Sequence, residues 1–306
     1  MRLGADHVRV KVPATSANLG PGFDAMGLAL GVVDEVEVRA LGSTDVVVEI
    51  DGEGEGELPT GEDHLIVRAI RAALDDVGAP QVGLHLVCHN TIPHGRGLGS
   101  SAAAVVAGIL AARMLIGEPA ALHNTAAFRI ASAFEGHPDN AAPAILGGGT
   151  ISWTDPEGPH ATQLPLHPDV EPVVLVPTTR LATKTARGVL PAVVPHADAA
   201  FTAGRAALLV QALCHRPEIL LEATEEKLHQ HYRAGVMPGT WHLVQALRAA
   251  GQAAVVSGAG PSVLVLEQTS DREGADRVRS EILATLQDTW TVLHPGFADG
   301  ALAERL

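Results

Sequence analysis

Residues 93–104, PHGRGLGSSAAA, carry the clearest chemical signal in the sequence. Three glycines alternate with larger residues and two serines follow them, at Gly95, Gly97, Gly99, Ser100 and Ser101. Glycine permits a positive φ and a close approach of the backbone to a ligand. The serines stand at N-cap positions before the alanine-rich run 102–112, which predicts a helix. Because a helix N-terminus favours anions, the segment predicts a phosphate-binding loop.

Two familiar phosphate motifs do not fit this segment. A P-loop ends in Gly-Lys-Ser/Thr, and no lysine precedes the two serines. The dinucleotide motif G-x-G-x-x-G fails because Ser100 stands three residues after Gly97. On chemistry alone, the alternative is a glycine-rich turn that caps a buried helix.

Other segments combine glycine or proline with polar side chains of the kind found in binding sites. They are 13–24 (PATSANLGPGFD), 135–140 (EGHPDN), 177–187 (PTTRLATKTAR) and 257–262 (SGAGPS). The last of these is equally compatible with a tight turn that needs its glycines.

The composition limits the classes of function. The chain has 306 residues, 46% hydrophobic and 18% charged, which is typical of one large or two ordinary globular domains. The net charge of −14 and the lack of a dense Lys/Arg cluster argue against a nucleic-acid partner. An acidic protein that binds an anion needs local help from Mg²⁺, arginines and helix dipoles.

The cysteines and the apolar runs indicate a compartment. Cys88 and Cys214 form no CxxC motif and are expected as small buried thiols. Residues 1–10 lack a signal-peptide core, and the run 102–112 is far shorter than the roughly 18 residues of a membrane span. We therefore expect a cytoplasmic protein with no membrane partner.

Hydrophobic periodicity predicts the elements that position these segments. Strands are expected at 7–12, 34–40, 45–50, 82–88, 150–153, 170–176, 253–256, 263–266 and 289–293, and helices at 64–77, 102–112, 119–134, 197–214, 240–250 and 272–286. Residues 13–22 are expected as a loop and 155–162 as a linker. Without strict βαβα alternation, the order favours an α+β fold over a doubly wound sheet.

Three motifs, at 13–24, 93–104 and 256–262, stand in an order that resembles the GHMP kinases, which phosphorylate small molecules with ATP. The segments ANLGPGFD (17–24), GHPDNAAPA (136–144) and TKTAR (183–187) are similar to the homoserine kinase family in particular. The resemblance covers nearly the whole chain. It implies an N-terminal ribosomal-protein-S5-like domain at 1–157, a C-terminal ferredoxin-like domain at 158–306, and an active site between them.

The resemblance implies a reaction as well. The γ-phosphoryl group of ATP would pass to the side-chain hydroxyl of L-homoserine, giving O-phospho-L-homoserine in threonine biosynthesis. The expected partners are L-homoserine and MgATP, with a homodimer left open. Two alternatives remain: a GHMP kinase for mevalonate or shikimate, and a non-catalytic binding protein on the same fold. Against a mevalonate kinase, Asn140 stands where those enzymes carry an aspartate.

The site residues follow from the same resemblance. For the ATP phosphates they are Pro93, Gly95, Arg96, Gly97, Leu98, Gly99, Ser100, Ser101, Ala102 and Ala103, and for Mg²⁺ Ser101 and Glu135. For homoserine they are Asn18, Asp24, His137, Asn140, Thr183, Arg187, Arg233, Gly258 and Gly260, and for catalysis His137, Asp139, Asn140 and Arg187. Asp24 would bind the ammonium group, and Arg187 and Arg233 the carboxylate, because arginine grips a carboxylate at two points.

Several positions are also compatible with a role that involves no ligand. Arg96 is equally compatible with an exposed loop residue and Arg233 with a surface residue, while His229 and His231 are expected on a solvated helix face. The family often has Asn-Leu where this chain has His64-Leu65, so no adenine contact is assigned. Asn140 cannot accept a proton, so we expect catalysis by positioning and electrostatics.

Overall fold

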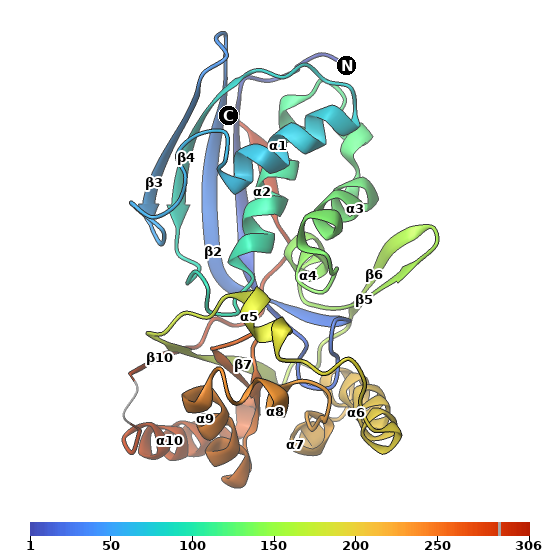
Figure 1. Ribbon diagram of the computed structural model, residues 1–306, viewed down its shortest axis with the longest axis vertical. Coiled ribbons are helices and arrows are strands. Elements are labelled where there is room, and N and C mark those ends of the chain that lie inside the picture. Colours follow the sequence, from blue (N-terminus) through green and yellow to red (C-terminus); the bar gives the residue numbers. More distant parts are fainter. Residues whose placement is uncertain (287–288) are drawn as a thin grey trace.

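The computed structural model describes residues 1–286 and 289–306 (Figure 1). Its strands are β1 (His7–Ala17), β2 (Met26–Leu41), β3 (Val46–Gly52), β4 (Gly83–Asn90), β5 (Gly149–Asp155), β6 (Gly158–Leu164), β7 (Val170–Pro177), β8 (Ala253–Val256), β9 (Val263–Gln268), β10 (Trp290–Leu293) and β11 (Leu302–Arg305). Its α-helices are α1 (Leu65–Asp76), α2 (Ser100–Leu115), α3 (Asn124–Glu135), α4 (Ala141–Leu146), α5 (Thr183–Gly188), α6 (His196–Cys214), α7 (Leu220–Ala223), α8 (Gln230–Arg233), α9 (Pro238–Ala249) and α10 (Arg272–Leu283). Short 3₁₀ helices lie at Pro119–Leu122, Pro217–Ile219 and Thr269–Asp271.

The first sheet has seven strands and dominates the upper half of Figure 1. Its main order is β11-β1-β2-β4-β3, with β5 paired to β2 and β6 to β5. The pairing is antiparallel except between β3 and β4. Helices α1, α2 and α3 cover one face of the sheet. The predicted alternation of β1 is confirmed, since Val8, Val10 and Val12 are fully buried.

Helix α2 runs through the interior of this half and is buried on most of its surface. It is rich in alanine, and a Cβ at Gly108 would lie 2.5 Å from the carbonyl oxygen of Ile66, so small residues let α2 pack closely on α1. This packing fixes the helix N-terminus, which points toward the second half of the molecule. Among the described helices, none combines the length and apolarity needed to cross a bilayer.

The second sheet has four antiparallel strands in the order β10-β7-β9-β8. Numbered along the chain, this order is 4-1-3-2, with helices between the first and second strands and between the third and fourth. That arrangement is the β-α-β-β-α-β pattern of the ferredoxin-like fold. Helices α9 and α10 pack beside this sheet, and the short helix α5 lies between the two halves (Figure 1). The predicted α+β class is confirmed.

The expected linker at 155–162 is a β-hairpin instead. Strand β6 pairs with β5 along its length, and the turn lies between Asp155 and Gly158. Asp, Pro and Gly mark linkers and hairpin turns alike, which explains the error. Strand β11, at the C-terminal end, also returns to the first sheet by pairing with β1. The division at 157/158 stays a prediction, and both β6 and β11 pair within the first sheet.

Two other expectations are revised. The predicted loop at 13–22 begins as strand, because β1 pairs with β2 as far as Ala17. A register shift between Pro13 and Ala14 accommodates the proline. The predicted helix at 119–134 is interrupted at His123, whose ring nitrogen accepts the backbone N–H of Ala126.

Candidate active site

The three glycine-containing motifs meet between the two halves of the molecule. The backbone N–H of Thr15 donates to the carbonyl of Leu98 (3.0 Å), which joins the first motif to the glycine loop. The Ser257 hydroxyl lies 2.7 Å from the carbonyl oxygen of Gly97 and 2.8 Å from the hydroxyl of Ser16. Segments far apart in the sequence therefore build one site.

The glycine loop needs its glycines for both space and conformation. Gly97 and Gly99 have φ values of 71° and 68°, which L side chains rarely adopt. A Cβ at Gly99 would lie 1.9 Å from the hydroxyl oxygen of Thr15, and one at Gly97 would lie 2.2 Å from the carbonyl oxygen of Ser257. The loop therefore presses directly against both other motifs.

The start of α2 corrects the predicted cap. The N-cap residue is Gly99, in the left-handed conformation, and Ser100 and Ser101 are the first two helical residues. The hydrogen bond from the N–H of Ala103 to the carbonyl of Gly99 (2.9 Å) belongs to the first turn of the helix. The backbone N–H groups before Ala103 therefore point out of the helix, where an anion can accept them.

A polar cavity of about 170 Å³ opens at this helix end. It lies next to all three motifs and to α5. Its lining residues are Asn18, Gly95, Gly97, Gly99, Ser100, Ser101, Glu135, His137, Asp139, Asn140, Leu181, Ala182, Thr183, Arg187, Arg233, Gly258 and Ala259. Most of the residues predicted from the sequence therefore share one cavity.

Ser101 and Glu135 contact each other on one wall of this cavity. The Ser101 hydroxyl donates to Oε1 of Glu135 at 2.6 Å. Glu135 is the last residue of α3, and Gly136 ends the helix in the left-handed conformation. A hydroxyl and a carboxylate beside a helix N-terminus are hard oxygen donors of the kind that Mg²⁺ prefers.

A hydrogen-bonded chain of His137, Asp139, Asn140 and Thr15 lies beside the same cavity. Oδ1 of the buried Asp139 lies 2.5 Å from Nδ1 of His137 and accepts the side-chain amide N–H of Asn140 at 3.2 Å. Oδ1 of Asn140 in turn accepts the hydroxyl of Thr15 (2.8 Å). Burial alone would lower the pKa of His137, but the hydrogen bond to Asp139 and its charge outweigh burial, so the pKa is raised.

Asp24 and Arg187 form a two-point ion pair. The Arg187 guanidinium donates to both carboxylate oxygens of Asp24, at 2.7 and 3.2 Å. The hydrogen bond to Asp24 raises the pKa of Arg187. The sequence assigns these residues to opposite ends of homoserine, and in the structure they bind each other.

The first motif is strained where it meets this pair. Asn18, Leu19 and Asp24 all have positive φ values, of 72°, 48° and 56°. The Asn18 side chain accepts the N–H of Asp24 (3.0 Å) and donates to the carbonyl of Gly258 (2.7 Å), which holds the turn in place. Strained backbone held by such contacts is common at functional sites.

Arg233 is buried, with 1% of its surface exposed, and lines the cavity. Burial lowers its pKa to about 10. His229, expected on a solvated helix face together with His231, is fully buried, whereas His231 is exposed. The sequence missed this because α8 has only four residues, so no amphipathic periodicity develops.

Some predicted residues lie outside the polar cavity. Arg96 donates to the carbonyls of Pro177 (2.9 Å) and Thr178 (3.2 Å), which ties the glycine loop to the end of β7. It is therefore neither an exposed loop residue nor part of the lining. Leu98 is buried in the hydrophobic core. Gly260 packs on Met237, whose sulfur would lie 2.5 Å from a Cβ there. Pro93, Ala102 and Asp24 also lie outside the lining.

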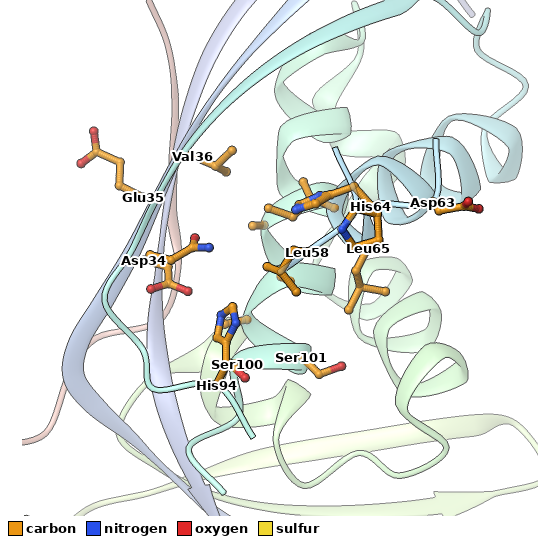
Figure 2. Close-up of a pocket in the computed structure, with 16 residues that line it drawn as sticks. Asp34, Glu35, Val36, Leu58, Asp63, His64, Leu65, His94, Ser100 and Ser101 are labelled. Atoms are coloured by element: carbon orange, nitrogen blue, oxygen red, sulfur yellow. The ribbon is translucent and has the colours of Figure 1, made fainter. Parts of the chain in front are cut away.

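A larger and mostly apolar cavity of about 320 Å³ lies on the other side of Ser100 and Ser101 (Figure 2). Its walls come from β2, the end of β4, the segments before α1 and α2, the first turn of α1 and the first two turns of α2. Its lining residues are Asp34, Glu35, Val36, Leu58, Pro59, Asp63, His64, Leu65, Ile66, Asn90, His94, Ser100, Ser101, Ala103, Ala104 and Ala107. Apart from Ser100, Ser101 and Ala103, the sequence assigned none of them. The only hint of this cavity in the sequence was the dipeptide His64-Leu65, which stands where the family often has Asn-Leu.

Two polar groups of the larger cavity are perturbed by burial. Burial raises the pKa of Asp34 to about 6, although its carboxylate accepts the backbone N–H groups of Thr91 and Ile92. Burial also lowers the pKa of His64, so its ring is neutral near pH 7. Nδ1 of His64 is buried and has no hydrogen-bond partner among the described residues. Unpaired buried groups beside a cavity suit a ligand with matching polar atoms.

Known proteins resemble this chain over most of its length. The family of GHMP kinases N-terminal domains matches residues 64–148. The homoserine kinase of Streptomyces avermitilis is 54% identical over 89% of this chain and 88% of that protein. The homoserine kinase of Clavibacter michiganensis is 49% identical over 94% of this chain and 90% of that protein.

Solved structures agree with these relatives. A homoserine kinase from Cytophaga hutchinsonii has a TM-score of 0.84 and 25% identity, with 98% of both chains covered. A mevalonate diphosphate decarboxylase from Enterococcus faecalis, 13% identical with a TM-score of 0.67 over 99% of this chain and all of that one, shares the fold alone. The chain therefore belongs to the homoserine kinase family and has the GHMP kinase fold.

Proposed function

We propose that this enzyme transfers the γ-phosphoryl group of ATP to the side-chain hydroxyl of L-homoserine, giving O-phospho-L-homoserine for threonine biosynthesis. One observation carries the proposal: Ser100 and Ser101 line both cavities. The N-terminus of α2 thus lies between an apolar cavity of nucleotide-like character and a small polar one. Phosphate bound at this helix end would face an acceptor in the polar cavity.

The larger cavity suits the adenosine part of ATP. Its walls are mainly apolar, and the buried His64 contributes an unpaired ring nitrogen. From there the triphosphate would reach the backbone N–H groups of Gly99, Ser100 and Ser101 at the start of α2. Arg96 supports the loop through its hydrogen bonds to the carbonyls of Pro177 and Thr178.

The smaller cavity suits a zwitterion with a hydroxyl tail. Asp24, paired with Arg187 just outside the lining, offers a carboxylate for the ammonium group, while Arg187 and Arg233 offer guanidinium groups for the carboxylate. Asn18, Thr183 and Gly258 add polar groups to the lining. The ion pair between Asp24 and Arg187 keeps both groups in place until substrate shares them.

The residues beside α2 fit a magnesium ion. The Ser101 hydroxyl and the Glu135 carboxylate would hold it, since their oxygens already lie 2.6 Å apart. When bound, Mg²⁺ would neutralise charge on the phosphate oxygens during transfer.

The geometry supports catalysis by positioning. Asp139 is buried, and its Oδ1 already accepts hydrogen bonds from His137 and Asn140, so this oxygen serves to hold those two side chains in place. Asp24 is engaged with Arg187. The raised pKa of His137 increases its protonated share near neutrality, which disfavours it as a base. We infer that the hydroxyl proton leaves late and passes to the transferred phosphoryl group.

A coupled ADP-release assay tests the proposal. Purified, folded enzyme with MgATP should release ADP in the presence of L-homoserine, and much less with mevalonate, shikimate or no acceptor. Equal rates with mevalonate or shikimate would favour another GHMP kinase activity. ADP release at background level with every acceptor would favour a non-catalytic binding protein. A cytoplasmic location, the absence of nucleic-acid and membrane partners, and the open possibility of a homodimer stay predictions from the sequence.

A further inference from the structure

A buried histidine stands directly behind the proposed carboxylate-binding arginine. His229 is fully buried, and its ring stacks on Phe23 with ring centroids 4.8 Å apart. Its Nδ1 lies 3.1 Å from Nη1 of Arg233. Arg233 is also placed over the Phe23 ring, 5.7 Å from its centroid. The three side chains form one packed group beneath the polar cavity.

The partners of His229 define its tautomer. Nε2 lies 2.8 Å from the carbonyl oxygen of Gly20, which can only accept, so Nε2 carries the hydrogen. Nδ1 then bears a lone pair and faces Nη1 of Arg233, which can only donate. Burial lowers the pKa of His229, which keeps the ring neutral near pH 7. Both contacts therefore require one neutral form of the ring.

Arg233 is held by a small number of acceptors. Its Nε donates to the carbonyl of Ala186, next to Arg187, and its Nη1 also donates to the carbonyl of Gly258 (both 3.2 Å). The third acceptor of Arg233 is Nδ1 of His229, which belongs to a side chain, whereas the other two are backbone carbonyls. The two carbonyls belong to segments that line the cavity, so together these contacts fix the plane of the guanidinium relative to it.

Glu226 holds the histidine in turn. Its side chain is 1% exposed, and its carboxylate accepts the backbone N–H groups of His229 (2.8 Å), Gln230 (2.9 Å) and Leu228. These bonds shape the tight turn that enters α8. They bring the His229 ring beneath Phe23 and place Arg233 one helical turn later.

We propose that His229 is a positioning residue for homoserine: its neutral ring, fixed by Gly20, holds the Arg233 guanidinium in the plane that receives the substrate carboxylate. This inference rests on the proposed function. A two-point grip on a carboxylate depends on the orientation of the guanidinium, and small errors in orientation weaken it. His229 itself does not line the polar cavity.

Two conservative variants separate this role from a merely structural one. In His229→Asn, the amide oxygen takes about the place of Nδ1 and keeps an acceptor for Arg233, but the donor to Gly20 is lost. In His229→Gln, the amide nitrogen reaches toward Gly20, but the acceptor at the Nδ1 position is lost. His229→Phe removes both contacts and keeps an aromatic ring beside Phe23. His231→Asn, at the exposed neighbouring histidine, is the matched control.

The measurements are KM for homoserine, KM for ATP and kcat, with the thermal midpoint and ATP binding without homoserine as checks of folding. We expect His229→Gln and His229→Phe to raise the homoserine KM about tenfold or more, and His229→Asn to raise it less than about threefold. The ATP KM should change less than about twofold in all variants. The control should match the wild type.

The following results would overturn the inference. Equal homoserine KM values in His229→Asn and His229→Gln would show that the acceptor for Arg233 is unimportant. A parallel rise in the ATP KM, or loss of folding in all three variants, would assign His229 to the general structure. Wild-type enzyme without homoserine-dependent ADP release would instead reject the proposed function, so the two failures are distinguishable.

Discussion

Arg187 and Asp24, 163 positions apart in the sequence, form a bidentate ion pair at the edge of the polar cavity, with Nη2–Oδ1 and Nη1–Oδ2 distances of 2.7 and 3.2 Å. One residue comes from the strained turn after β1 and the other from α5, which lies between the two halves of the molecule. The pair ties the first motif to α5, with Arg187 in the lining of the polar cavity and Asp24 just outside it.

Arg187→Lys should raise the homoserine KM by about tenfold, with little change in the ATP KM. Lysine keeps the positive charge but cannot make the planar two-point contact to a carboxylate. Steady-state kinetics with each substrate varied in turn measures both constants. Lys184→Arg, at an exposed position of the same helix, is the control and should behave as wild type. A comparable rise in the ATP KM would place Arg187 at the nucleotide or in the fold.

Glu135→Gln and Ser101→Ala should each lower kcat by about 10- to 100-fold and raise the Mg²⁺ concentration needed for half-maximal rate. Each change removes one oxygen ligand of the proposed ion while leaving the glycine loop intact. The measurement is the initial rate against free Mg²⁺ at saturating ATP and homoserine. Glu118→Gln, on an exposed turn, is the control. An unchanged Mg²⁺ dependence in both variants would contradict the assignment.

Asn140→Ala should lower kcat, because the variant loses the side-chain amide that holds Thr15 and that would orient the acceptor substrate. No change at Asp24, Asp139 or His137 should remove an acidic limb from the pH profile of kcat. The measurement compares wild type with Asp24→Asn, Asp139→Asn and His137→Gln. If one of these abolishes an acidic limb present in the wild type while homoserine still binds, that residue is a general base and the positioning mechanism fails.

Asp34→Asn should stabilise the protein at pH 8. The pKa of Asp34 is raised from 3.8 to about 6 by burial, so the native state binds this proton more tightly than the unfolded state. The protonated carboxyl group of Asp34 therefore contributes to the stability of the native state below about pH 4. This contribution is lost as the pH rises through about 6. Asparagine avoids the buried charge and keeps an oxygen for the N–H groups of Thr91 and Ile92.

The expected gain from Asp34→Asn is about 1 to 3 kcal/mol in the free energy of unfolding at pH 8, and it should shrink toward pH 4. Urea denaturation at both pH values measures it. Asp45→Asn, at an exposed position, should show no such trend. A stability difference that is the same at pH 4 and pH 8 would show that the carboxylate is not destabilised by burial.

The sequence by itself determined the parts of this protein that depend on local chemistry. The glycines and the alanine-rich run predicted the tight turn and the helix that begins after it, because positive φ at Gly97 and Gly99 is a property of those residues. The alternation of β1 predicted a half-buried strand. The order of the three motifs predicted the family. Local signals failed where a linker and a hairpin turn have the same composition. The segment between Asp155 and Gly158 was therefore expected as a linker and is a hairpin turn.

Only the tertiary structure decided which side chains meet. Asn18 contacts Gly258, and Ser16 contacts Ser257, across about 240 intervening residues, and no local pattern encodes such pairs. His229 is polar and lies in a charged segment, yet packing against Phe23 buries it completely. The nucleotide-like cavity likewise arises where α1, α2 and β2 come together, and its walls have no shared motif. Burial and partner choice depend on the assembled core, because they are set by what other segments bring to the same place.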